Sequence, residues 1–198
     1  MPHEVTKRFE RALCEYTGAK YAVAVNSCTM ALFLALKWYA AGCEKPYVDV
    51  PKFTYCSVPM SAIHAGCQPI LTDKVWRGSY QLYPSRVWDC ARRFTSGMYE
   101  PGSFQCVSFH TSKILGDSQG GAILHDNEAA DDWFRRSRFD GRREGVIPAQ
   151  DNLGIGWHCY LSPDVAARLL LKLSFLPKDN LDLPNSDYPD LSLQECFK

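Results

Sequence analysis

The run Tyr21–Val25 (YAVAV) passes through the polar turn Asn26–Thr29 (NSCT) into the apolar run Met30–Ala41 (MALFLALKWYAA), which ends at Gly42. The first run is short and rich in valine, which is typical of a buried strand, whereas the last is long enough for a helix. This stretch therefore predicts a strand that opens through small polar residues directly into a helix.

The predicted strand-to-helix turn has two interpretations. Free backbone N–H groups and the positive end of the helix dipole favour an anion such as a phosphate. The simpler interpretation is that Asn26, Ser27 or Thr29 only caps the helix. Helix caps are commoner than phosphate sites, so the turn alone leaves both interpretations open.

Strands and helices alternate on both sides of this stretch. Apolar residues at helical spacing predict a first helix over Val5–Tyr16, stopped by Gly18. Further strands are expected at 46–50, 68–73, 86–89, 104–109 and 120–125, and further helices at 56–65, at 128–138 and from Pro163 onward. This alternation predicts an α/β three-layer sandwich, with a mostly parallel sheet covered by helices.

The domain organisation follows from the composition along the chain. Residues 1–176 are expected to form one compact domain, which suits a chain of 198 residues. Residues 177–198 are rich in Pro, Asp, Asn and Ser, so we expect a loosely held C-terminal extension. Residues 74–85 show no clear period, and residues 145–160 are expected to be a loop.

Charge and cysteine usage exclude several classes of protein. The formal net charge is zero and no basic block occurs, so no nucleic-acid or membrane partner is expected. No apolar run has the length of a membrane span, and the first residues start no signal-peptide pattern. The nine cysteines form no C-x-x-C pair, which argues against a metal site and favours reduced thiols in the cytoplasm.

Asp89 and Lys113 follow two neighbouring predicted strands and could face one ligand. An amine and a carboxylate are what a pyridoxal phosphate enzyme needs, the amine for a Schiff base and the acid beside the pyridine nitrogen. Taken alone, each residue has a simpler interpretation, because lysines are mostly solvated and an aspartate after a strand is often a turn residue.

Four stretches in unbroken order carry a resemblance to a known family. They are Phe9–Leu32 with NSCTMAL, Val50–Tyr55 (VPKFTY), Asp89–Ala122 with DCAR, SFHTSK and GGA, and Leu153–Ala167 with LGIGWHCYLS. Together they resemble the sugar aminotransferases of the DegT/DnrJ/EryC1/StrS family, in a shortened form. The resemblance implies the large domain of the type I pyridoxal phosphate-dependent transferase fold, without the family's C-terminal small domain.

The resemblance also implies catalytic roles. Lys113 would bind pyridoxal 5′-phosphate covalently and then move a proton between the substrate carbon and the cofactor. Asp89 would pair with the pyridinium nitrogen. Tyr55 would stack on the cofactor ring, and Arg92 would lie near its phenolic oxygen or the substrate.

The remaining implied contacts concern the cofactor phosphate. By the resemblance it would be bound by the turn Ser27, Cys28 and Thr29 together with Ser108. His158 would reach it from a partner subunit, which implies a homodimer with shared active sites.

The implied reaction is a two-step transamination. An amino acid, glutamate being the expected donor, would convert the cofactor to pyridoxamine 5′-phosphate, and a keto-sugar nucleotide would then accept the amine. The alternative is a reduced, non-catalytic protein of this fold with a binding or interaction role. The sequence also leaves open whether the chain is a minimal natural enzyme, for instance a viral one, or a fragment.

The chain departs from the family pattern in several places. The segment between Asp73 and Asp89 is shorter than in the family. Cys28 replaces a glycine, Arg92 replaces Gln or His, and His158 replaces Asn. A positive φ at Cys28 would strain the backbone, whereas a negative φ would be tolerated.

Overall fold

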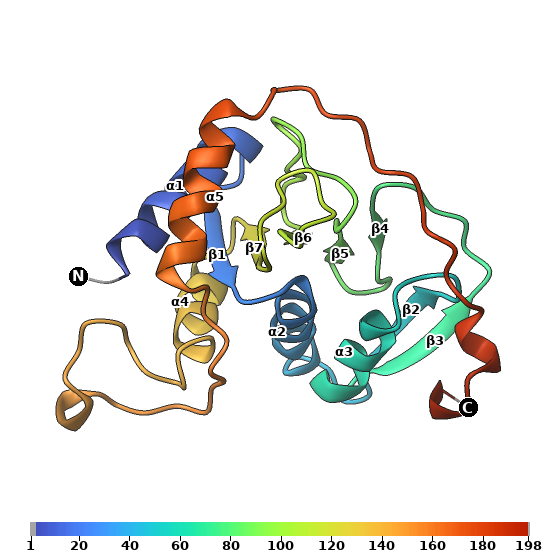
Figure 1. The fold of residues 1–198 in the computed structure, drawn as a ribbon. Helices are drawn as coiled ribbons and strands as arrows, with labels where there is room; N and C mark the ends of the chain where they lie inside the picture. Colours follow the sequence, from blue (N-terminus) through green and yellow to red (C-terminus); the bar gives the residue numbers. More distant parts are fainter. Residues whose placement is uncertain (1–2, 198) are drawn as a thin grey trace.

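A five-stranded mixed sheet forms the middle layer of the computed structural model, which describes residues 3–197 (Figure 1). Its strands lie in the order β1 (Tyr21–Val25), β7 (Gly121–His125), β6 (Phe104–Ser108), β5 (Val87–Asp89) and β4 (Tyr80–Gln81). A second sheet pairs β2 (Tyr47–Pro51) with β3 (Gln68–Thr72) in parallel. The Asp49 N–H donates to the Tyr83 carbonyl oxygen at 2.7 Å, so the small sheet adjoins the β4 edge of the large one.

Helices cover both faces of the large sheet. On one face lie α1 (Glu4–Thr17) and α5 (Pro163–Phe175), and on the other lie α2 (Cys28–Ala40) and α4 (Glu128–Ser137). Helix α3 (Ser57–Ala65) packs between α2 and the small sheet. Alternate residues of a strand point to opposite faces. Accordingly Val23 and Ile123 join the core around α2, while Ala22 and Leu124 join the core around α1 and α5. The predicted three-layer α/β fold is confirmed.

The sheet is mixed, not mostly parallel as we expected. Only β5 and β6 pair in parallel within it, whereas β1–β7, β6–β7 and β4–β5 are antiparallel. The reason lies in the connections, since a parallel crossover needs a long linker that is usually helical. The links 82–86 and 109–120 contain no helix, so each returns the chain in the opposite direction.

The predicted helices and strands are present, and their ends differ from the prediction by at most one or two residues. At several helix ends the capping residue sets the boundary. Gly18 and Gly66 adopt left-handed conformations after α1 and α3, as the glycine stops suggested. Helix α2 begins two residues earlier than predicted, because the Ser27 hydroxyl accepts a hydrogen bond from the Met30 N–H. Strand β4 was not predicted. Short 3₁₀ turns occur at Pro148–Gln150, Leu191–Leu193 and Glu195–Phe197.

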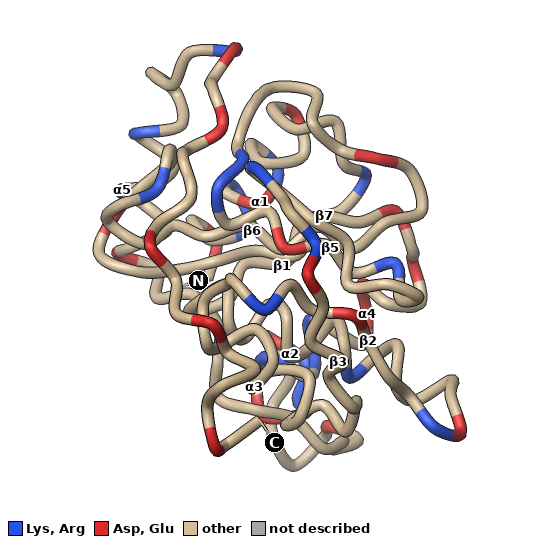
Figure 2. Tube along the Cα trace, turned by 90° about the vertical axis from the view of Figure 1, so that its right-hand side faces the viewer, with Lys and Arg blue, Asp and Glu red and all other residues tan. Residues whose placement is uncertain are grey.

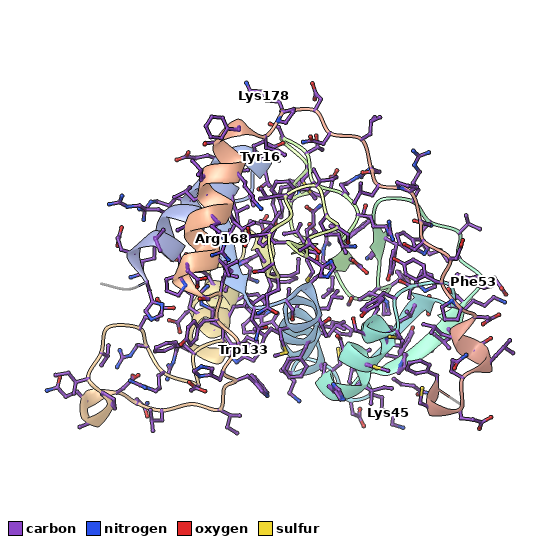
Figure 3. The ribbon with its side chains drawn as sticks, in the orientation of Figure 1. Tyr16, Lys45, Phe53, Trp133, Arg168 and Lys178 are labelled. Carbon is purple, nitrogen blue, oxygen red and sulfur yellow. The ribbon has the colours of Figure 1, made fainter. Side chains whose placement is uncertain are left out.

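The C-terminal segment is tied to the domain, contrary to the expectation of a loosely held extension. It runs from the end of α5 across the molecule towards β2 and β3 (Figure 1). The Tyr16 hydroxyl donates to the Pro177 carbonyl oxygen at 2.5 Å, and Figure 3 shows Tyr16 beside Lys178. Further along, Leu191 is 1% exposed. The division at residue 176 stays a prediction.

Charged residues are spread over the whole trace. Figure 2 shows acidic and basic positions interspersed along the chain, in keeping with the zero formal net charge. None of the helices in residues 3–197 is long and apolar enough to cross a membrane.

A buried ion pair joins α1 to β1 and to the end of α4. Glu10 accepts hydrogen bonds from Arg138, from Arg135 Nη1 at 2.7 Å and from the Ala24 N–H at 2.9 Å. Glu10 and Arg138 are almost completely buried. Burial opposes ionisation of Glu10, but the two guanidinium groups and the Ala24 N–H outweigh it and lower the pKa of Glu10.

We predict that Glu10→Gln lowers the free energy of unfolding by about 2–3 kcal/mol at pH 7. It removes the carboxylate that pairs with both Arg135 and the buried Arg138, and it leaves Arg138 with Glu144 as its remaining ion-pair partner. The matched control is Glu4→Gln in the same helix, where the side chain is about half exposed and little change is expected. Urea unfolding measures both.

The effect of Glu10→Gln depends on pH. Since the pKa of Glu10 is lowered on folding, its stabilisation is complete above the ordinary glutamate pKa and is lost as the pH falls through the folded-state pKa. The wild type and the variant should therefore converge in acid. Equal losses for Glu10→Gln and Glu4→Gln would contradict this account.

Candidate active site

A cavity of about 650 Å³ opens at the edge of the sheet where β1, β5 and β6 end. Strand β7 runs the other way, so its start at Gly120 reaches the same edge. The cavity lining also includes the loop between β2 and α3, Trp76 and residues 186–189 of the C-terminal segment. Ligands of α/β sheets gather at the carboxyl ends of the strands, which is where this cavity lies.

Eight of the nine predicted site residues line this one cavity. They are Ser27, Cys28, Thr29, Tyr55, Asp89, Arg92, Ser108 and Lys113. The ninth, His158, does not line it. His158 is exposed and its Nδ1 lies 2.9 Å from Asp140 Oδ2. The role predicted for it needs a second copy of the chain and stays a prediction, as do the roles of the other eight.

The start of α2 forms an anion-binding geometry at one end of the cavity. The first N–H groups of a helix lack partners within the helix, and here they belong to Cys28 and Thr29. The Thr29 hydroxyl donates to Ser57 Oγ at 2.9 Å, which links this turn to α3. Gly121 of β7 lies so close that a Cβ there would stand 2.5 Å from the Cys28 nitrogen. The backbone at the turn is therefore held in place by close packing.

Cys28 fits this turn without backbone strain. Among the described non-glycine residues only Asp140 has a positive φ, so Cys28 does not need the conformation that favours glycine. Its thiol lies 3.6 Å from the Cys106 carbonyl oxygen and donates to it. Burial, and next the nearby Asp89 carboxylate, raise the pKa of the Cys28 thiol well above its ordinary value, which keeps it neutral.

Asp89 is buried with both carboxylate oxygens engaged. Oδ1 accepts from the Ala91 N–H at 2.8 Å, and Oδ2 accepts from the Tyr80 hydroxyl at 2.9 Å. The Tyr80 hydroxyl also lies 2.6 Å from Thr54 Oγ1. Burial raises the pKa of Asp89, although the Ala91 N–H, Tyr80, Lys113 and Arg92 each oppose this. A carboxylate of this kind binds a proton or a cationic nitrogen more readily than an exposed one.

Lys113 lies on the loop that follows β6. Its N–H donates to the His110 carbonyl oxygen at 2.8 Å, and Lys172 of α5 donates to the Gly116 carbonyl oxygen at 2.7 Å, which ties the loop to the helix. Burial lowers the pKa of Lys113, and the Arg92 charge lowers it further, against the opposing effects of Asp89 and Cys28. The nucleophilic neutral amine is thus more available at neutral pH than in an exposed lysine.

The site residues fit pyridoxal phosphate. The cavity holds a lysine of lowered pKa, a buried carboxylate and a helix start that suits a phosphate, all presented from different strand ends. Tyr55 lines the cavity with 59% of its surface exposed, so its ring is available to a planar ligand. Within residues 3–197 no group of three or more His, Cys, Asp or Glu side chains is arranged to hold a metal ion.

Several residues in or next to the cavity were missed by the sequence reasoning. Tyr80 and Thr54 support Asp89, while Trp76 and Tyr188 line the opening. Tyr80 lies directly opposite Asp89 in the β4–β5 pair. The one sequence signal for this pairing was the short distance along the chain between Gln81 and Val87. A link that short can join only neighbouring antiparallel strands.

Residues 3–99 match the sequence model of the DegT/DnrJ/EryC1/StrS aminotransferase family. The chain is 43% identical over 67 residues to spore coat polysaccharide biosynthesis protein SpsC of Bacillus subtilis, a match that covers 34% of this chain and 17% of that protein. It is 25% identical over 205 residues to UDP-4-amino-4,6-dideoxy-N-acetyl-beta-L-altrosamine transaminase of Campylobacter jejuni, covering 81% of this chain and 54% of that protein.

Solved structures share the fold. AtS13 from Actinomadura melliaura superposes with a TM-score of 0.77 at 18% identity, over 87% of this chain and 60% of that one. Sugar aminotransferase CalS13 from Micromonospora echinospora gives a TM-score of 0.75 at 17% identity, over 87% and 61%. The chain thus spans little more than half the length of its longer matches.

We predict that Lys113 of the cofactor-free protein reacts with acetic anhydride with a midpoint pH below the ordinary lysine value of about 10.4, because only the neutral amine reacts. Arg92→Gln should move that midpoint upward, since it removes a positive neighbour that lowers the pKa of Lys113. Mass spectrometry of the Lys113 peptide across a pH series measures both midpoints.

Arg93→Gln is the matched control for this labelling. Arg93 is adjacent in sequence and also contacts the C-terminal segment, through Asp182, but it does not line the cavity. The Lys113 midpoint should stay in place in this variant. An upward shift of equal size in Arg92→Gln and Arg93→Gln would show that the Arg92 charge has no specific effect.

Proposed function

We propose that the chain, whose residues 3–99 match the sequence model of the DegT/DnrJ/EryC1/StrS aminotransferase family, is a pyridoxal phosphate-dependent aminotransferase of that family. Its amino donor in this proposal is an amino acid, with glutamate the first candidate, and its acceptor is a keto-sugar nucleotide. The observation that carries the proposal is the meeting of Lys113, Asp89 and the start of α2 in one cavity. The name of the Campylobacter relative supports the nucleotide-sugar class.

Each side chain has a defined task in this proposal. When bound, the cofactor supplies an electron sink for loss of the proton from the amino-bearing carbon. The helix start at Cys28 and Thr29, with Ser108, binds the phosphate. The Asp89 carboxylate would keep the pyridine nitrogen protonated. Tyr80 and the Ala91 N–H fix the orientation of this carboxylate. Lys113 Nζ would hold the cofactor, and its amine would be the group that moves the proton.

We propose further that two copies share their active sites, with His158 contributing to the partner's phosphate site. The segment around His158 projects from the domain in Figure 1, and Ile147, Leu153 and Ile155 on it are largely exposed. Such a surface suits burial against a second chain. The nine free cysteines fit the cytoplasm as the compartment of this enzyme.

We predict that Lys113→Ala abolishes the visible absorbance that pyridoxal phosphate gains on covalent attachment to the protein. Lys45→Ala is the matched control, because Lys45, which is labelled in Figure 3, is exposed and lies outside the cavity. Wild type and Lys45→Ala should attach the cofactor covalently, change absorbance on addition of glutamate and release 2-oxoglutarate, whereas Lys113→Ala should attach no cofactor covalently and release no 2-oxoglutarate.

Two outcomes would contradict the proposal differently. A wild-type protein that binds no added cofactor would exclude pyridoxal phosphate chemistry. A protein that binds the cofactor but does not respond to glutamate or other amino acids would favour the alternative, a non-catalytic protein of this fold with a binding role.

A further inference from the structure

A part of the C-terminal segment forms one wall of the candidate active site. We call residues 182–191 the strap, which Figure 1 shows passing the β4 side of the sheet on its way to β2 and β3. Ser186, Asp187, Tyr188 and Pro189 of the strap line the same cavity as Asp89 and Lys113. The strap thus contributes to the same cavity as the residues that would bind the cofactor.

The strap is docked at both ends. At the first end, Asp182 accepts from Arg93 Nε at 3.0 Å and Nη2 at 2.8 Å, and the Leu183 N–H donates to the Arg92 carbonyl oxygen at 2.9 Å. At the other end, Leu191 is buried and its N–H donates to the Lys52 carbonyl oxygen at 3.0 Å. Two docked ends fix the backbone of the residues between them over the cavity.

The loop before β4 makes close contacts with the first docked end of the strap. Gly78 has a positive φ of 70°, and a Cβ there would lie 2.1 Å from Asp182 Oδ2, so both its backbone conformation and its closeness to Asp182 favour glycine. Asn185 Nδ2 donates to the Trp76 carbonyl oxygen at 2.8 Å from the same loop. The loop before β4 therefore serves as a seat for the strap.

The middle of the strap is connected to the catalytic carboxylate through aromatic rings. The Tyr188 ring stacks on Trp76 with centroids 6.2 Å apart, and Trp76 contacts Tyr80 at 4.7 Å. Tyr80 in turn donates to Asp89. The Trp76 and Tyr80 rings therefore stand between the strap and Asp89.

Arg92 is occupied by the strap. Its Nε donates to the Tyr188 hydroxyl at 3.0 Å, and its two other nitrogens donate to the Pro184 carbonyl oxygen and to Ser186 Oγ. All these acceptors are neutral, so the guanidinium charge stays in the cavity wall. Arg92 therefore holds the strap in place, in addition to its predicted position near the cofactor or substrate.

Asp187 differs from the other acids of the strap. Asp182 and Asp190 form ion pairs with Arg93 and Lys52, whereas Asp187 lines the cavity without a hydrogen-bond or ion-pair partner among residues 3–197. A free carboxylate on a cavity wall accepts hydrogen bonds from hydroxyl groups, and each bond to a charged group contributes strongly to binding.

We propose that the strap is the acceptor-side wall of the active site and that Asp187 and Tyr188 are specificity-determining residues that contact hydroxyl groups of the sugar nucleotide. This inference rests on the proposed function and deepens it. The cofactor contacts come from other segments, so the strap governs binding of the acceptor and leaves binding of the cofactor unchanged.

The test uses the full chain without cofactor and UDP-N-acetylglucosamine as the probe. Asp187→Asn keeps the size of the side chain and removes its charge, and it should weaken binding of the probe about tenfold in calorimetry, as expected for a lost charged hydrogen bond. Asp179→Asn is the matched control, because Asp179 is exposed on the same segment outside the cavity.

A second pair of variants separates docking from the single contact. Leu191→Asp should release the far end of the strap, speed hydrogen exchange over residues 182–191 and weaken binding of the probe at least as much as Asp187→Asn. Leu193→Asp is its control, because Leu193 is 70% exposed whereas Leu191 is 1% exposed. Uptake of pyridoxal phosphate should be the same in all four variants.

The outcomes keep the two proposals apart. Equal binding of the probe by wild type and Asp187→Asn would overturn the inference, and so would a wild type that does not bind the probe up to about 1 mM, the upper range for substrates. Loss of cofactor uptake in Leu191→Asp but not in Leu193→Asp would also overturn it, since the strap would then be structural. Failure of wild type to take up cofactor would contradict only the proposed function.

Discussion

The buried carboxylate of Asp89 is the constraint on which the geometry of the site depends. A carboxylate removed from water must have its oxygens paired, and here this takes a backbone N–H two residues on and a tyrosine hydroxyl from the next strand. That tyrosine is Tyr80 of β4, which lies directly opposite Asp89 in the β4–β5 pair. Thr54, in the loop after β2, forms a hydrogen bond with the same Tyr80 hydroxyl. The two sheets therefore meet around this one group.

The direction of the Asp89 pKa shift connects this constraint to the chemistry. Because burial raises the pKa of Asp89, the folded protein binds a proton at Asp89 more readily than the unfolded chain does. Ionisation of Asp89 therefore lowers the stability of the fold as the pH rises from the ordinary aspartate pKa through the raised pKa of Asp89. In the proposed function, a protonated pyridine nitrogen beside the carboxylate would supply the missing positive charge. Lys113, with its lowered pKa, lies at the same strand ends, so a single desolvated cavity prepares both groups for their proposed roles.

Features with local causes could be predicted from the sequence, and features with distant causes could not. Gly18, Gly66 and Asn127 end or begin helices through their own backbone or side chain, and these helices were found. The strand ends that carry Asp89 and Ser108 were found too, since apolar runs mark them. The role of Tyr80 depends on a partner across a hairpin, and no period in residues 74–85 reveals that pairing.

The strap shows the same limit more clearly. Its composition is that of a loose tail, and few of its residues are buried apart from Leu191, so nothing in its own sequence predicts an ordered path. Its order comes from groups far away in the chain, namely Lys52, Gly78, Arg92 and Arg93. Sequence reasoning therefore recovered the residues proposed for the cofactor better than those proposed for the acceptor.

The two sides of the cavity differ in how firmly they are held. The cofactor side is built from strand ends with buried side chains on both faces of the sheet, so it should open only with the domain. The strap is held by one buried leucine, by hydrogen bonds that Arg92 and Asn185 make, by the contact of Tyr188 with Trp76, and by ion pairs with partly exposed side chains, which contribute little to stability in water. Opening of the strap thus needs much less free energy than unfolding. In the proposed function one cavity would serve two different substrates in turn, and a wall that opens while the opposite strand ends stay in place would meet that requirement.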